Sequence, residues 1–185
     1  MQICLFGGAF DPPHLGHQLV AKSLLGHKIC DEVWFVPLKQ HPFGKEVEVN
    51  GHRVEMLKMI LEPQMRIEGF ELEHSGKSFS IDTLNTLSSR YPQIKFSWVI
   101  GSDNLLKFNR WKDFQDMLSR FTVYVYPRKG FVFEPMLDGM IKLDNFPEVT
   151  VSSTEVRAKI VAGQSITGLV DERVEQYIKE NGLYK

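Results

Sequence analysis

A glycine-rich turn between an apolar strand and a helix constrains the fold of this chain more than any other feature. The turn belongs to the run LFGGAFDPPHLGH, between a strand expected at Ile3–Phe6 and a helix expected at His14–Leu25. Gly7 and Gly8 allow the backbone to turn sharply and to approach an anion closely. The first turn of the following helix offers free amides and the positive end of its dipole. The segment therefore predicts a phosphate-binding site.

Two histidines stand at the start of that helix. His14 and His17 are three residues apart, so they share one helical face and lean back toward the turn. Gly16 lies between them and costs about 1 kcal/mol of helix stability relative to alanine, which favours a ligand that approaches closely there. The alternatives are two surface histidines in an ordinary turn, or a zinc site. Zinc is disfavoured, because Cys4 lies within the strand and no further His or Cys cluster stands nearby.

Strands and helices alternate along the chain. We expect strands at Ile3–Phe6, Asp31–Pro37, Arg66–Glu73, Lys95–Ile100 and Thr122–Pro127. We expect helices at His14–Leu25, Gly51–Leu61, Ser80–Tyr91 with a serine cap, Trp111–Phe121, Thr154–Ala162 and Val170–Asn181. This order predicts an α/β fold, a doubly wound parallel sheet with right-handed crossovers and helices on both faces, followed by C-terminal helices.

Polar segments follow the expected strands, where ligands bind in such sheets. Residues 7–17 follow the first strand, the Lys39–Lys45 loop follows the second, and Gly101-Ser102-Asp103 follows the fourth. We therefore expect these segments to meet at one edge of the sheet.

Composition limits the classes of protein that this chain can belong to. Its 185 residues, 43% hydrophobic and 24% charged, predict a single domain over residues 1–185. A net charge of −1 gives no basic field to attract nucleic acid. Cys4 and Cys30 lack CxxC spacing, which favours reduced thiols and a cytoplasmic location, and no apolar run is long enough for a membrane span. The sequence leaves open whether the chain forms a homo-oligomer.

A second candidate anion site lies near the C-terminus, in the run VSSTEVR. Ser152 or Ser153 can cap the helix that begins there, and the hydroxyls and free amides suit phosphate oxygens. Arg157 lies one turn later on the same face as Ser153 and can reach the same anion. The alternative is an ordinary capping box between Ser152 and Glu155.

Together, the segments GGAFDPPHLGH and SSTEVR resemble the paired signatures of the HxGH nucleotidylyltransferase superfamily. Three further segments, SFSIDTL, GSDNLLKFNRW and GLVDERVEQYIKENGLY, are similar to the corresponding stretches of the nicotinate-nucleotide adenylyltransferase family. The resemblance covers essentially the whole chain. It implies a Rossmann-like nucleotidylyltransferase domain that transfers AMP from ATP to nicotinate mononucleotide, with release of pyrophosphate. Mg²⁺ would arrive with ATP as substrate, and no resident metal site is implied.

The resemblance also implies roles for particular residues. The catalytic group would be His14, His17 and Arg157, with His17, protonated by the adjacent phosphates, facing the α-phosphate. ATP would be bound by Gly7, Gly8, Ala9, Phe10, Lys45, Ser153 and Thr154. The mononucleotide would be bound by Thr83, Asp103 and Trp111.

The chain departs from the family pattern at two places. Ala9 stands where the family has threonine, and the Lys39–Lys45 loop has one proline and a displaced histidine, His41. Nicotinamide mononucleotide and phosphopantetheine are therefore alternative acceptors. A non-enzymatic ATP- or NAD-binding module is a further alternative, whereas the absence of a G-x-G-x-x-G motif disfavours a dehydrogenase.

Overall fold

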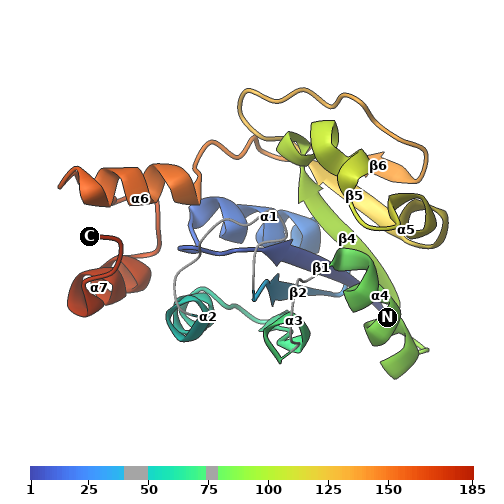
Figure 1. The fold of residues 1–185 in the computed structure, drawn as a ribbon, viewed down its shortest axis with the longest axis horizontal. Helices are drawn as coiled ribbons and strands as arrows, with labels where there is room; N and C mark the ends of the chain where they lie inside the picture. Colours follow the sequence, from blue (N-terminus) through green and yellow to red (C-terminus); the bar gives the residue numbers. More distant parts are fainter. Residues whose placement is uncertain (40–49, 74–78) are drawn as a thin grey trace.

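A parallel β-sheet forms the centre of the molecule (Figure 1). The computed structural model describes residues 1–39, 50–73 and 79–185. Within these residues six strands form one sheet in the order β3-β2-β1-β4-β5-β6, and every neighbouring pair is parallel. The strands are β1 (Gln2–Gly8), β2 (Glu32–Pro37), β3 (Met65–Ile67), β4 (Lys95–Gly101), β5 (Thr122–Tyr126) and β6 (Met140–Lys142). This order confirms the predicted doubly wound α/β fold.

Helices cover both faces of the sheet, as predicted. One hydrophobic cluster packs the sheet against α1 (Leu15–Gly26), α2 (Asn50–Met59), α6 (Ser153–Val161) and α7 (Glu172–Asn181). The second cluster packs the other face against α4 (Ser80–Arg90), the 3₁₀ helix η1 (Ser102–Arg110) and α5 (Phe114–Arg120). Figure 1 shows α6 and α7 at one side of the molecule, opposite α5 and β6.

The central strand β1 is buried on both faces. Cys4 and Phe6 belong to the cluster beneath α1, whereas Ile3 and Leu5 belong to the cluster beneath α4. The alternation of side chains along a strand explains this division. Because β1 pairs with β2 on one side and with β4 on the other, the chain order reverses at β1. The carboxyl ends of β1 and β4 are therefore where this fold class binds ligands.

The prediction of one strand over Arg66–Glu73 was wrong. The strand β3 is limited to Met65–Ile67, and the short helix α3 (Phe70–Glu73) follows it. Gly69 directly precedes that helix, and its carbonyl accepts bonds from the amides of Leu72 and Glu73. An edge strand has one neighbour only, so little holds the extended backbone beyond the three paired residues.

Three other local predictions also differ from the structure. The helix η1 and the edge strand β6 were not expected, since η1 is a 3₁₀ helix and β6 has only three residues. The N-cap of α4 is Phe79, which makes no side-chain cap bond, so the expected serine cap was wrong. In α1, Leu15 and Leu19 are each 37% exposed, because the buried face follows Gly16, Val20 and Leu24.

None of the helices within the described ranges combines the length and the apolar character needed to cross a bilayer. Cys4 and Cys30 are both buried and free, as the sequence predicted.

Candidate functional site

The turn after β1 is built differently from the sequence prediction. Gly7 and Gly8 are the last residues of the strand, and the left-handed residue of the turn is Phe10, with φ of 49°. A Cβ on Gly7 would overlap the indole ring of Trp98, and a Cβ on Gly8 would lie 3.1 Å from the ring of Phe10. The two glycines thus make room for aromatic rings beside the end of β1.

The two predicted catalytic histidines contact each other directly. His14 is the N-cap of α1, and its backbone N–H donates to Nδ1 of His17 over 3.1 Å. The rings stack with their centroids 3.7 Å apart and their planes at 20°. Because Nδ1 of His17 accepts this bond, the proton of the neutral ring belongs on Nε2. His17 is therefore prepared to donate one hydrogen bond from Nε2.

Both histidines are held in the neutral form. Burial lowers the pKa of His14 to about 3, with a further lowering by the nearby Arg128 cation. Burial also lowers the pKa of His17 well below its usual range, and His14 and Arg128 add to this effect. A charged imidazole is disfavoured in both places because it would lose hydration and face another cation.

Gly16 serves packing within the protein rather than close approach of a ligand, which corrects the sequence prediction. A Cβ at this position would overlap the side chain of Val149 and lie 3.0 Å from Nδ1 of His14. Nδ1 of His14 is itself buried and has no hydrogen-bond partner among the described residues. The imidazole of His14 is thus fixed from one side by the chain, with one ring nitrogen left unsatisfied.

The second predicted anion site lies directly against the first. Ser153, at the start of α6, donates from Oγ to the carbonyl of Pro12 over 2.9 Å. Arg157 donates from Nη1 to the carbonyl of Asp11 over 2.5 Å, and the same nitrogen lies 3.7 Å from the Asp11 carboxylate. These bonds join segments more than 140 residues apart in the sequence, so the two segments that resemble the paired family signatures meet in the structure.

The serine cap of α6 is also confirmed. The Oγ of Ser152 accepts from the amide of Glu155 over 3.2 Å, which is one of the two hydrogen bonds of a capping box. Thr154 is exposed in the first turn of the helix.

The C-terminal end of the chain makes a further contact with the turn, because the hydroxyl of Tyr184 donates to the Asp11 carboxylate over 2.8 Å. The turn is therefore held from two sides by the C-terminal region.

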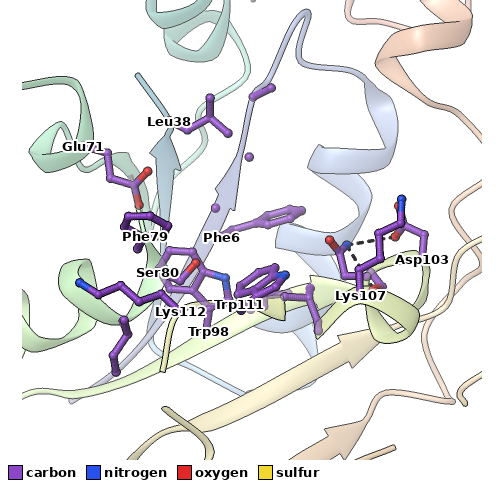
Figure 2. A pocket seen from close by; sticks show the side chains of 18 of the residues that line it. Phe6, Leu38, Glu71, Phe79, Ser80, Trp98, Asp103, Lys107, Trp111 and Lys112 are labelled. Atoms are coloured by element: carbon purple, nitrogen blue, oxygen red, sulfur yellow. Dashed lines mark hydrogen bonds between the residues drawn. The ribbon is translucent and has the colours of Figure 1, made fainter. Parts of the chain in front are cut away.

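A cavity of about 600 Å³ opens beyond the carboxyl ends of β1 and β4 (Figure 2). This volume suits a ligand of nucleotide size. Five of the predicted binding residues line it, and they are Gly7, Gly8, Ala9, Asp103 and Trp111. Figure 2 shows Trp98 and Trp111 between two groups of polar residues, with Glu71 and Ser80 on one side and Asp103 and Lys107 on the other. The cavity is thus lined by the aromatic rings of Trp98 and Trp111, with polar side chains on either side of them.

Trp111 stands at the end of η1 and presents a flat ring to the cavity. Its indole stacks on the ring of Phe108, with centroids 4.9 Å apart and planes at 29°. Phe108 is fully buried, so it fixes the orientation of the indole. Trp111 therefore both packs on the core and offers an aromatic surface to a ligand.

Thr83 was predicted to bind the mononucleotide but does not line the cavity. It is fully buried in α4, and its Oγ1 donates to Oε1 of Glu71 over 2.8 Å. Glu71, from α3, is the residue of this pair that lines the cavity. Thr83 therefore reaches the site through Glu71, a contact that no sequence pattern indicated.

Two arginines at the site were missed by the sequence reasoning. Arg53 of α2 is fully buried and donates to the carbonyls of Ala9 and of Leu38, the latter over 2.6 Å. Arg128 follows β5, and its charge reaches both histidines. The position of Arg128 just beyond a strand was a usable signal, whereas nothing in the sequence around Arg53 marks it as buried.

Lys45, predicted to contact ATP, lies outside the described residues.

Comparisons with known proteins agree on one family. The model of the family described as Cytidylyltransferase-like matches residues 5–159. The chain is 38% identical to the probable nicotinate-nucleotide adenylyltransferase of Halalkalibacterium halodurans, over 100% of this chain and 91% of that protein. It is 34% identical to the nicotinate-nucleotide adenylyltransferase of Bacillus subtilis, over 100% of this chain and 98% of that protein.

A solved structure has the same fold. The structure of Plasmodium falciparum nicotinic acid mononucleotide adenylyltransferase complexed with NaAD matches with a TM-score of 0.85 and 22% sequence identity. The match covers 99% of this chain and 97% of that chain. The doubly wound sheet and the helices around it are thus shared over the full length.

Proposed function

Because this chain belongs to the cytidylyltransferase-like family, and within it to the nicotinate-nucleotide adenylyltransferases, we propose that it transfers AMP from ATP to nicotinate mononucleotide. The products are the dinucleotide deamido-NAD and pyrophosphate, so the chain is a nucleotidyltransferase of NAD biosynthesis. This membership argues against the non-enzymatic binding module as an alternative.

One observation supports this function above the others. The turn that carries His14 and His17 is bonded to α6 through Ser153 in its first turn and Arg157 one turn later. The same turn begins at Ala9, which lines the cavity. A triphosphate placed against the turn would therefore have its α-phosphate next to a cavity large enough for a second nucleotide.

The reaction needs positioning more than proton transfer. An oxygen of the mononucleotide 5′-phosphate attacks the α-phosphorus of ATP, and the bond from that phosphorus to the bridging β-phosphate oxygen breaks. The electron pair leaves with pyrophosphate, and the attacking phosphate is already ionised at neutral pH. The chain therefore contributes mainly in-line alignment and stabilisation of charge on the α-phosphate.

His17 is proposed to bind the α-phosphate as a neutral donor. Its Nδ1 is occupied by the backbone N–H of His14, which leaves Nε2–H to point at a phosphate oxygen. The low pKa of His17 belongs to the chain without phosphate, and a bound anion opposite the ring would raise it. The hydrogen bond itself does not require the charged form.

Arg157 and Ser153 are proposed to hold the turn and to complete the phosphate site. Each already bonds a backbone carbonyl of the turn, and Arg157 retains a side chain that is 36% exposed. The guanidinium has five N–H donors, so it can bond the turn and a phosphate together. The exposed Thr154 stands beside the free amides of the same helix start.

The mononucleotide is proposed to occupy the aromatic part of the cavity. The free face of Trp111 suits a pyridine ring, and the carboxylate of Asp103 can accept hydrogen bonds from ribose hydroxyls. Glu71 and Thr83 would shape the opposite end. We expect Mg²⁺ to enter with ATP as part of the substrate, where it would offset the negative charge of the phosphates. In the described ranges no three His, Cys, Asp or Glu side chains gather as a metal site of the chain's own.

The test is a pyrophosphate-release assay with ATP and Mg²⁺ and three separate acceptors. We expect release with nicotinate mononucleotide at the highest kcat/KM and a product with the mass of deamido-NAD. A higher kcat/KM with nicotinamide mononucleotide or phosphopantetheine would assign a different acceptor to the same chemistry. Absence of release with all three acceptors would contradict the proposed reaction.

A further inference from the structure

Arg128 connects three parts of the site that are distant in the sequence. Its backbone N–H donates to the hydroxyl of Ser102 over 3.0 Å, at the start of η1. Its Nη1 donates to the carbonyl of Val151 over 3.1 Å, one residue before the N-cap of α6. Its Nε lies 3.7 Å from Oδ1 of Asp103, which lines the cavity. The side chain is only 17% exposed.

Gly101, the last residue of β4, leaves space for this arrangement because it has no side chain. A Cβ there would lie 2.7 Å from Cγ of Arg128 and would overlap the carboxylate of Asp103. Only glycine allows both side chains to cross the end of the strand. The approach of Arg128 to Asp103 is therefore built into the backbone and is not an incidental surface contact.

The ion pair between Arg128 and Asp103 is loose. Bidentate ion pairs of arginine with a carboxylate have two parallel hydrogen bonds, with N···O distances of about 2.7–2.9 Å. Here the separation of Nε from Oδ1 is 3.7 Å. The positive charge of Arg128 is also felt at the two histidines of α1, where it lowers both pKa values. The guanidinium is thus close to the proposed phosphate position while only weakly neutralised by its carboxylate.

We propose that Arg128 is a phosphate-binding residue that exchanges its loose ion pair with Asp103 for an oxygen of the ATP triphosphate. The exchange leaves the Asp103 carboxylate available to the ribose of the mononucleotide. This inference rests on the proposed function, since it assumes that the triphosphate lies beside the histidine turn. In this exchange, binding of ATP frees the Asp103 carboxylate before the mononucleotide binds.

The exchange is favourable on electrostatic grounds. A triphosphate carries several negative charges, whereas Asp103 carries one and is partly exposed to water, which screens it. The bond of Nη1 to Val151 already directs the guanidinium toward the start of α6, where free amides favour anions. Arg128 would therefore gain a short charge-assisted bond without leaving its place in the fold.

The test measures ATP binding by calorimetry in the absence of mononucleotide. Arg128→Met is expected to weaken ATP binding about 10- to 100-fold, the range for loss of one hydrogen bond to a charged group. Adenosine, which lacks phosphates, should bind with unchanged affinity. The matched control is Arg120→Met, which removes the same charge from an exposed pair on α5 and should change neither affinity. An equal loss for ATP and adenosine, or less than a twofold loss for ATP, would overturn the proposal.

A second variant tests the exchange even where Arg128→Met does not fold. In Asp103→Asn the competitor for the guanidinium is neutral, so ATP should bind as tightly as in the parent chain or more tightly, while the KM for the mononucleotide rises. Weaker ATP binding in Asp103→Asn would show that the pair is merely structural and would refute the exchange. These ATP affinities are independent of turnover. A chain that binds ATP through Arg128 but releases no pyrophosphate would contradict the proposed function alone.

Discussion

His14 donates its backbone N–H to Nδ1 of His17 and stacks its own ring on the same imidazole, 3.7 Å away between centroids. This contact decides the tautomer of His17, because a ring nitrogen that accepts a hydrogen bond carries no proton. The motif therefore works as a unit, in which one histidine orients the other. We propose that this arrangement leaves one donor, Nε2–H of His17, directed toward the α-phosphate.

His17→Ala should lower kcat far more than it weakens ATP binding. The loss of one donor to transition-state charge typically costs about 10²–10³ in kcat. We expect a change in the ATP dissociation constant of less than tenfold, measured by calorimetry beside steady-state rates. Leu19→Ala, at a half-exposed position of the same helix, is the matched control and should leave kcat unchanged. Equal losses in kcat and in ATP affinity would argue against the proposed role.

Acid should destabilise the chain below about pH 6.5 through His14. Its pKa is about 3 in the folded chain and about 6.5 when unfolded, so the unfolded state binds more protons between these values. The free energy of unfolding should fall by about 2 kcal/mol between pH 7 and pH 5 from this residue alone. Urea unfolding at pH 7, 6 and 5 checks this. A variant His14→Gln should show a smaller dependence, and an unchanged dependence would exclude His14 as the cause.

Trp111→Ala should raise the KM for the mononucleotide and leave the KM for ATP nearly unchanged. Stacking on an aromatic ring is worth about 0.5–1.5 kcal/mol, which corresponds to about 2- to 10-fold in KM. Trp111→Phe keeps a flat ring against Phe108 and should retain most of the affinity. If the KM for the mononucleotide stays constant in Trp111→Ala, the indole is not part of that subsite.

Thr83→Val should lower thermal stability through the loss of its bond to Glu71. The cost is about 1–3 kcal/mol, because a buried carboxylate oxygen loses a donor. Thr83→Ser keeps the hydroxyl and is the control. Since Thr83 does not line the cavity, any rise in the KM for the mononucleotide should be smaller than in Trp111→Ala. A larger rise would place Thr83 in direct contact with substrate, as the family resemblance implied.

Gly7→Ala should destabilise the chain by about 1–3 kcal/mol, because the new methyl group would overlap Trp98 in a packed wall of the cavity. The control is Gly26→Ala at the end of α1, where a Cβ meets nothing within 4 Å. That change should be neutral or slightly stabilising. Urea denaturation of both variants makes the comparison. If the two variants were equally stable, close packing would not be the reason for Gly7.

The sequence determined the architecture of this protein because its signals are local and repeated. Alternation of apolar strands with amphipathic helices is sufficient to specify a parallel sheet covered on both faces, and the strand ends then place polar segments at one edge. The two motifs around His14 and Arg157 are also local patterns, but their meeting was implied only by the family resemblance, and the bond of Arg157 to Asp11 shows it.

The roles of several individual residues depend on contacts that form only in the folded chain. Gly7 and Gly16 are required by Trp98 and Val149, and Thr83 acts through Glu71. Likewise, Arg128 lies 3.7 Å from Asp103, and its charge lowers the pKa of both histidines. Each of these contacts joins residues far apart in the chain. Their distances depend on the packing of whole elements, which no pattern of neighbouring residues encodes.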